Sequence, residues 1–172
     1  MELIEHFEVD ATPDVGITFS SIPATFTDLY LVVSGKTSRT NSPRDNIKVQ
    51  FNGVTSGYSY KLLEGTGSAA GSSGASSQAQ IVITNALSTN MSGLDDLFGS
   101  TAIYIPNYLS SNEKSVSSEQ TSIRNSTDSH SAIQASLSTI TSPITSIYLS
   151  PENGDFVQYS SASLFGIKSL DT

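Results

Sequence analysis

The sequence predicts an all-β protein, a single antiparallel β-sandwich of jelly-roll type with at most one short helix. The chain holds 33 serines and 17 threonines, and they are interleaved with Val, Ile, Leu, Phe and Tyr, as in strands with one wet face. Short strand-like runs recur along the chain with turn residues between them, which is typical of sandwiches and jelly rolls. A length of 172 residues fits one domain with a sizeable core. We therefore expect residues 1–172 to form one domain of nine or ten strands.

The first third of the chain contains three strand-like runs. The opening "ELIEHFE" indicates a first strand or a short arm, and we favour the strand. In "DVGITFSSIP", Ile17 and Phe19 share one face of the next strand. The run "FTDLYLVVSGKTS" is the most apolar of the chain. It predicts a strand, centred on residues 29–33, that is buried on both faces.

A hairpin is predicted next. "DNIKVQFNG" alternates between apolar and polar residues and ends in Asn52-Gly53, a pair suited to positive φ in a tight turn. The following "GYSYKLLEG" is the expected return strand of this hairpin.

The stretch "GTGSAAGSSGASSQ", residues 65–78, consists almost wholly of Gly, Ser and Ala. It has the composition of a domain linker, but the runs before and after it read as strands of one sandwich. A dinucleotide-binding loop needs G-x-G-x-x-G and a following helix. Here the third glycine position falls on Ala70, and a strand-like run follows. We therefore predict a surface loop between two strands, held by a neighbouring subunit.

The second half of the chain continues the pattern. "AQIVITN" and "STAIYIPNY" predict strands, the latter with Ile103 and Ile105 facing inward, and "EKSVSSEQTSIR" and "SAIQASLS" predict polar strands with sparse apolar positions. The last segment predicts a hairpin around Asn153-Gly154 that closes on Leu164, Phe165 and Ile167.

A helical signal occurs only in "SGLDDLFG". Ser92 and Asp95 have capping-box spacing, and Leu87, Met91, Leu94 and Phe98 recur at near-helical intervals. Gly93 weakens the signal, so we expect one turn or a short helix.

Charge and composition exclude several classes of function. The 16 acidic residues exceed the 8 basic ones, which gives a net charge of −8 and disfavours binding to nucleic acid and to anionic membrane surfaces. The chain has no cysteine, which excludes disulfides and thiolate chemistry. No apolar run reaches the length of a transmembrane helix, and the glutamate-rich "MELIEHFEVD" is unlike a signal peptide. We expect the protein in the cytoplasm where it is made, or in a particle assembled there.

Motifs with chemical potential are weak. His6 and His130 are the two histidines, and we expect His130, at a turn into a strand, to be exposed or locally bonded rather than a metal ligand. The serines lack a G-x-S-x-G elbow, and Ser111-x-x-Lys114 lacks its companion motifs. Asp95-Asp96 indicates capping or turn chemistry rather than a tight calcium site. We predict no enzyme activity, no catalytic residue, no cofactor and no metal.

The tyrosines leave two alternatives open. A sugar-stacking platform would use their flat apolar faces and polar tips. Half-buried strand positions and subunit contacts would also explain them, and we favour this because strands are rich in aromatic residues. The candidates for the platform are Tyr58, Tyr60, Tyr104, Tyr108 and Tyr159.

Several motifs, taken in order, resemble a family of virion proteins of marine tailed phages, especially those of cyanobacteria and related ocean bacteria. They are "FSSIPATFTDLYL", "VQFNG", "YIPNY", "ITSI" and "SLFGIK", and the resemblance covers roughly residues 17 to 168. Many relatives carry a tryptophan before "ITSI", and this chain has none.

The resemblance implies a structural role. We expect a non-enzymatic capsid decoration or knob protein in the virion, made in the host bacterial cytoplasm, because no stalk, coiled-coil or adapter segment is visible. Its expected partners are further copies of itself, as a homotrimer, and the major capsid protein or other virion proteins. The alternative is a tail-fibre or spike module that contacts host surface glycans. The residues that we predict for partner contacts are Leu3, Ile4, Phe7, Tyr58, Gly67, Gly71, Ser73 and Tyr108.

Overall fold

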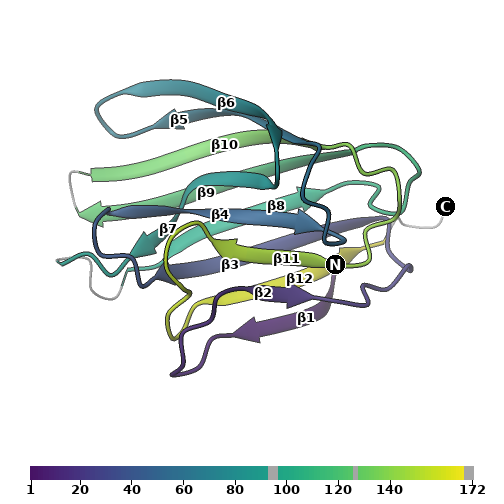
Figure 1. Cartoon of the computed structure of the whole chain (residues 1–172), viewed down its shortest axis with the longest axis horizontal. Helices are drawn as coiled ribbons and strands as arrows, with labels where there is room; N and C mark the ends of the chain where they lie inside the picture. The colour runs from purple at the N-terminus through teal and green to yellow at the C-terminus, as the bar shows by residue number, and fades with distance from the viewer. Residues whose placement is uncertain (93–96, 126–127, 169–172) are drawn as a thin grey trace.

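The structure is a computed structural model that describes residues 1–92, 97–125 and 128–168. It confirms the all-β, jelly-roll-like sandwich: every regular element of the described residues is a strand, and there are twelve of them (Figure 1). The strands are β1 (Glu2–Glu8), β2 (Ile17–Phe19), β3 (Asp28–Thr37), β4 (Arg44–Phe51), β5 (Tyr58–Gly65), β6 (Ala70–Gln78), β7 (Ile81–Thr89), β8 (Gly99–Ile105), β9 (Lys114–Asn125), β10 (Asp128–Ser138), β11 (Ile147–Pro151) and β12 (Ser161–Ile167).

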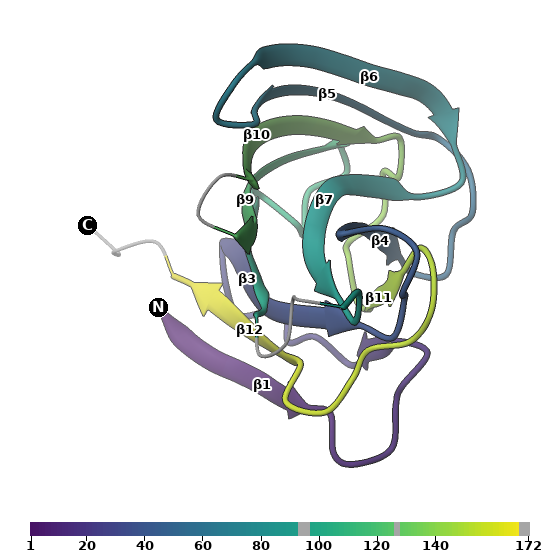
Figure 2. The ribbon, with the colours of Figure 1, turned by 90° about the vertical axis from the view of Figure 1, so that its left-hand side faces the viewer.

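The strands form two layers. The larger sheet has the order β6-β5-β10-β9-β8-β3-β12-β1, and all its neighbours are antiparallel. The smaller sheet has the antiparallel order β2-β11-β4-β7, and a short parallel contact between β7 and β3 joins it to the larger one. Figure 2 shows the larger sheet curving around β7, β4 and β11. This arrangement leaves one face of the larger sheet directed away from the smaller sheet.

The apolar core fills the space between β3, β8 and β12 of the larger sheet and the strands of the smaller one. Its residues alternate along strands such as β4, β8 and β12, as one-sided burial requires, whereas β7 lies between the layers and is buried almost throughout. The inward-facing side chains include Leu29, Leu31, Val33, Ile47, Val49, Phe51, Ile81, Ile83, Ile103, Ile105, Ile147, Leu149 and Leu164, each at most 1% exposed.

The interior under β9 and β10 is polar instead. Along both strands the buried positions carry mainly Ser, Gln and His, whereas Ile123, Ile133 and Leu137 point outward and are exposed. Some of these polar side chains form hydrogen bonds with main-chain carbonyls on the edge of β7 opposite β4. Gln134 donates to the Val82 carbonyl, and Ser122 donates to the Asn85 carbonyl. Buried polar groups of this kind need such partners. The polar strands that the sequence predicts therefore exist. Of their sparse apolar residues, Val116 and Ala132 are buried, whereas Ile123, Ile133 and Leu137 face solvent.

The prediction that β3 is buried on both faces, made from its apolar run, is wrong. Leu29, Leu31 and Val33 are buried, but Tyr30 is half-buried and Val32 is 37% exposed. The strand lies in the middle of the larger sheet, and no layer of the described residues covers the second face of that sheet.

The predicted Asn52-Gly53 turn has the expected backbone, with φ values of 53° and 68°. The prediction that the next strand returns alongside β4 as a hairpin is wrong, however. β4 pairs with β7 and β11, whereas β5 crosses to the larger sheet and pairs with β10 and β6. The turn reverses the chain, and the apolar faces of the two strands then pack in different layers.

The expected last hairpin is wrong for the same reason. β11 belongs to the smaller sheet, and β12 lies between β1 and β3 in the larger one. Gly154 does adopt a positive φ of 77° in the connection. Leu164 is buried as expected, while Phe165 and Ile167 are half-buried on the outer side of β12.

The predicted surface loop at 65–78 is also wrong. Residues 66–69 make a tight turn, with a hydrogen bond of 2.9 Å from the Thr66 N–H to the Ala69 carbonyl, and Gly67 has a φ of 81°. Gly65 ends β5, and residues 70–78 form strand β6, which pairs with β5. Gly and Ser have low strand propensity, but β5 supplies the main-chain partners that hold them extended.

The helix or turn expected around Ser92 and Asp95 falls largely on residues 93–96, outside the described residues. Within residues 1–92, 97–125 and 128–168, no helix has the length and apolarity of a membrane span.

Candidate binding groove and sheet edges

Most of the predicted partner contacts lie at the two edges of the larger sheet. Leu3, Ile4 and Phe7 belong to β1 at one edge, whereas Gly71 and Ser73 belong to β6 at the other. Gly67 lies in the turn that leads into β6. Leu3 is 53% exposed, while Ile4 and Phe7 pack partly against the core. The structure thus separates these residues into two edge surfaces.

Tyr58 and Tyr108 do not form a surface. Both are at most 1% exposed. The Tyr58 hydroxyl accepts a hydrogen bond of 3.0 Å from the Phe51 N–H, and the Tyr108 hydroxyl donates to the Pro23 carbonyl. Burial raises the pKa of both phenols above the ordinary value. Their burial removes them from the set of direct partner contacts.

The outer face of the larger sheet carries a concentration of exposed apolar side chains. Val32, Leu63, Ile123, Ile133 and Leu137 point to this side from four different strands, and each is 37–60% exposed. Monomeric proteins seldom gather such side chains on one face without a use for them. This face is therefore the main candidate for a binding function.

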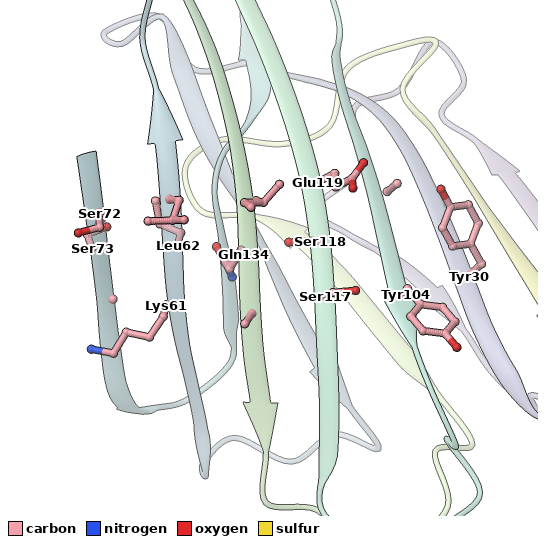
Figure 3. A pocket seen from close by; sticks show the side chains of 15 residues that line it. Tyr30, Lys61, Leu62, Ser72, Ser73, Tyr104, Ser117, Ser118, Glu119 and Gln134 are labelled. Atoms are coloured by element: carbon pink, nitrogen blue, oxygen red, sulfur yellow. The ribbon is translucent and has the colours of Figure 1, made fainter. Parts of the chain in front are cut away.

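A groove of about 850 Å³ lies in that face. Its residues come from β3, β8, β9, β10, β5 and β6, which are consecutive neighbours in the sheet. Small residues at Ala102, Ser117 and Ala135 occupy the middle, and larger side chains stand on both sides. Figure 3 shows Tyr30 and Tyr104 toward one side and Lys61 and Ser72 toward the other. The hollow thus results from small residues on the central strands.

Tyr104 is held in place by Asp28. Its hydroxyl donates a hydrogen bond of 2.9 Å to Asp28 Oδ2, while Asp28 Oδ1 accepts one of 2.8 Å from the Asn107 N–H. The hydrogen bond to the carboxylate raises the pKa of Tyr104, so the phenol stays neutral. Tyr30 is its direct cross-strand partner on β3. The groove therefore has a side built from two tyrosines, of which one is fixed in orientation.

The five tyrosines named from sequence do not form one platform. Only Tyr104 lines the large groove, and Tyr60 lines a smaller hollow beside it. Tyr159 is 64% exposed and lies between β11 and β12. Tyr30 completes the tyrosine side, and sequence reasoning missed it because it lies within the run read as wholly buried. The alternation of Leu29, Tyr30 and Leu31 is the sequence signal that places Tyr30 on the opposite face of the strand from the two leucines.

The two histidines lie apart from this groove. His130 is 1% exposed within β10, so the exposed alternative at a turn is wrong, and its Nε2 lies 2.9 Å from Glu64 Oε2 on the neighbouring strand β5, which corresponds to the bonded alternative. Its Nδ1 has no hydrogen-bond partner. His6 Nδ1 lies 2.8 Å from the Ser163 hydroxyl at the β1 edge. Among the described residues there is no group of three or more His, Cys, Asp or Glu side chains placed to hold a metal.

The fold and the groove together define a β-sandwich with an uncovered, grooved sheet face. Comparison with family models, with curated proteins and with solved structures finds no match to this chain.

Proposed function

We propose that this chain is a non-enzymatic structural protein of a phage particle, a decoration or knob protein that sits on the particle surface as a homo-oligomer. The order of its motifs resembles marine phage virion proteins, and the jelly-roll-like sandwich is compatible with that role. The observation that carries the proposal is the state of the β6 edge.

Strand β6 ends the larger sheet, and among residues 1–92, 97–125 and 128–168 it pairs only with β5. Its nine residues, AGSSGASSQ, include no charged residue and no proline. Proteins that remain monomeric protect such edges with lysine, proline, bulges or a covering segment, because an open ladder templates pairing with another chain. Here the outer ladder of β6 is left open along most of the strand, apart from a bulge near Ser77. An assembled state that covers this edge explains why it needs no other protection.

The opposite edge, β1, has a different character. It carries Glu2, Glu5 and Glu8 and the exposed Leu3. A contact between two unlike edges is heterologous, and such contacts close into a ring when the rotation between subunits permits. A closed trimer formed by these edges is the arrangement that we propose.

Localisation in purified particles tests the virion role. Antibody labelling of intact phage, combined with mass spectrometry of separated heads and tails, should find the protein on heads at a fixed ratio to the major capsid protein. Detection only on tails would reject decoration in favour of the tail-fibre alternative. Absence from purified particles would reject both.

An edge variant tests the assembly mode. Ser73→Lys places a charge on the open β6 edge, whereas Ser111→Lys adds the same charge in an exposed segment outside the strands. We expect light scattering to give an oligomeric mass for the unmodified protein and for Ser111→Lys, and a monomeric mass for Ser73→Lys. An oligomer that survives Ser73→Lys would show that the β6 edge is not the contact.

A further inference from the structure

We propose that the groove on the outer face of the larger sheet binds a segment of an uncharged, linear polysaccharide. This inference goes beyond the structural role proposed above, and it does not depend on where the protein sits in a particle. It rests on the shape of the groove, on the chemistry of its lining and on the hydrogen bonding of its floor.

The shape suits a chain rather than a compact ligand. The groove of about 850 Å³ is followed by a second hollow of about 360 Å³, and both are lined by Lys61 and Ala135. Along β10 the outward positions Ile133, Ala135 and Leu137 run from the first hollow into the second. The larger hollow crosses six neighbouring strands, from β3 to β6, and adjacent strands lie about 4.8 Å apart, so the two hollows form one depression whose long dimension runs across the strands.

The lining matches the two surfaces of a sugar ring. Tyr30, Tyr104, Leu63 and Ile133 offer flat or aliphatic surfaces for the C–H faces of sugars. The Asp28 hydrogen bond fixes the Tyr104 hydroxyl before any ligand arrives, and such preorganisation lowers the entropic cost of binding.

Polar groups lie between these apolar surfaces. Ser117, Ser72, Glu119 and Lys61 line the groove and present hydroxyl, carboxylate and ammonium groups. They supply both donors and acceptors, as sugar hydroxyl groups require. One cationic and one anionic side chain leave the lining without excess charge, and the whole chain carries −8. An uncharged polysaccharide fits this balance better than an acidic one.

The floor of the groove argues against a peptide. Strands β8, β9, β10 and β5 each have a neighbour on both sides, so their main-chain ladders are occupied. An extended peptide laid on them would find no main-chain partners, although strand addition depends on such partners. A sugar chain has no peptide groups to satisfy and uses side-chain hydrogen bonds and stacking alone. The groove and the open β6 edge are therefore suited to different occupants.

Titration with neutral hexasaccharides tests the proposal. Cellohexaose, mannohexaose and maltohexaose would be added separately to the full-length protein, with binding followed by calorimetry and by NMR shifts of the tyrosine rings. A hexagalacturonate of equal length serves as the charged comparison. We expect at least one neutral chain to bind and to shift Tyr104, and the charged chain to bind more weakly by about tenfold or more. Failure of all three neutral chains, or preference for the charged one, would overturn the proposal.

Two matched variants locate the site. Ala135→Phe fills the middle of the groove, whereas Ser131→Phe adds the same ring on the same face of the same strand, at a position that does not itself line the groove. We expect Ala135→Phe to weaken binding by roughly tenfold or more and Ser131→Phe to change it less than about twofold. Circular dichroism and thermal melts check that both variants fold. Equal affinity of both variants would contradict the assignment.

The same two variants distinguish a groove that binds a sugar from a groove that binds a second copy of the chain. If the outer face is an interface between copies, Ala135→Phe lowers the oligomeric mass in light scattering and Ser131→Phe does not. That result would overturn the polysaccharide assignment. We expect the mass of both variants to equal that of the unmodified protein.

Discussion

The side-chain amide of Gln134 donates a hydrogen bond to the main-chain carbonyl of Val82, with 2.9 Å between Nε2 and the oxygen. Gln134 lies on β10 of the larger sheet and Val82 on β7 of the smaller one, so the bond joins the two layers. Further along, the Ser122 hydroxyl donates to the Asn85 carbonyl at 2.9 Å. Side chains of the larger sheet thus supply hydrogen-bond donors to main-chain carbonyls on an edge of β7 that no described strand pairs with at these positions. Here buried polar contacts hold the sandwich together where apolar packing does so elsewhere.

Replacing Gln134 tests this connection. Gln134→Met keeps the length of the side chain but leaves the buried Val82 carbonyl without its donor. We expect a loss of about 1–3 kcal/mol in the free energy of unfolding, the usual cost of an unsatisfied buried polar group. Urea unfolding measures it. The control is Ser131→Ala on the exposed face of the same strand, and equal stability of the two variants would contradict the role of Gln134.

Lys114 is expected to stabilise the connections at one end of the larger sheet. Its ammonium group is buried and donates to the carbonyls of Ser110, at 2.8 Å, and Ile140, at 3.3 Å, and burial lowers its pKa. Lys114→Met removes these bonds, and we expect a loss of about 3 kcal/mol. Lys48→Met, at a half-buried site on β4, is the matched control. A loss at Lys114 no larger than that at Lys48 in the same urea assay would refute this expectation.

We expect Tyr58 to lower the stability of the protein at alkaline pH. Burial raises its pKa in the folded state above the ordinary value of 10.0. The unfolded chain therefore releases the phenol proton first, and the free energy of unfolding declines as pH rises above about 10. In Tyr58→Phe this decline should be smaller, although the lost bond to the Phe51 N–H lowers stability at pH 7 by about 1 kcal/mol. Unfolding curves at pH 8 and 10.5 compare the two proteins, and parallel declines would contradict the assignment.

Gly166 provides space for Phe26. A Cβ atom added at Gly166 would lie 2.2 Å from Cγ of the Phe26 ring, whereas one added at Gly65 has no neighbour within 4 Å. We expect Gly166→Ala to destabilise the protein by about 1–3 kcal/mol through overpacking. Gly65→Ala should stay within about 0.5 kcal/mol of the unmodified protein. Thermal unfolding measures both, and similar melting temperatures for the two variants would show that the ring moves aside freely.

The candidate site was predictable from sequence only in part. Tyr104 was named as a sugar-stacking candidate, and it lines the groove, but Tyr58 and Tyr108 from the same set are buried. Residue type does not reveal which side of a strand faces the core when both sides carry aromatic or apolar residues. Ser117 and Ala135 drew no attention as single residues. They make a groove only because β9 and β10 place them side by side.

The sequence by itself determined the fold class, the inward positions of strands such as β8, and the positive φ at Asn52 and Gly53. These features follow from local periodicity and turn chemistry, which act between residues close together in the chain. The tertiary structure decided which strands pair, and hence that β5 leaves β4 for β10 and that residues 70–78 become an edge strand rather than a loop. Pairing depends on contacts between distant segments, and Gly-Ser-Ala residues carry no pattern that identifies a partner. The β6 edge and the groove both arise from those long-range pairings.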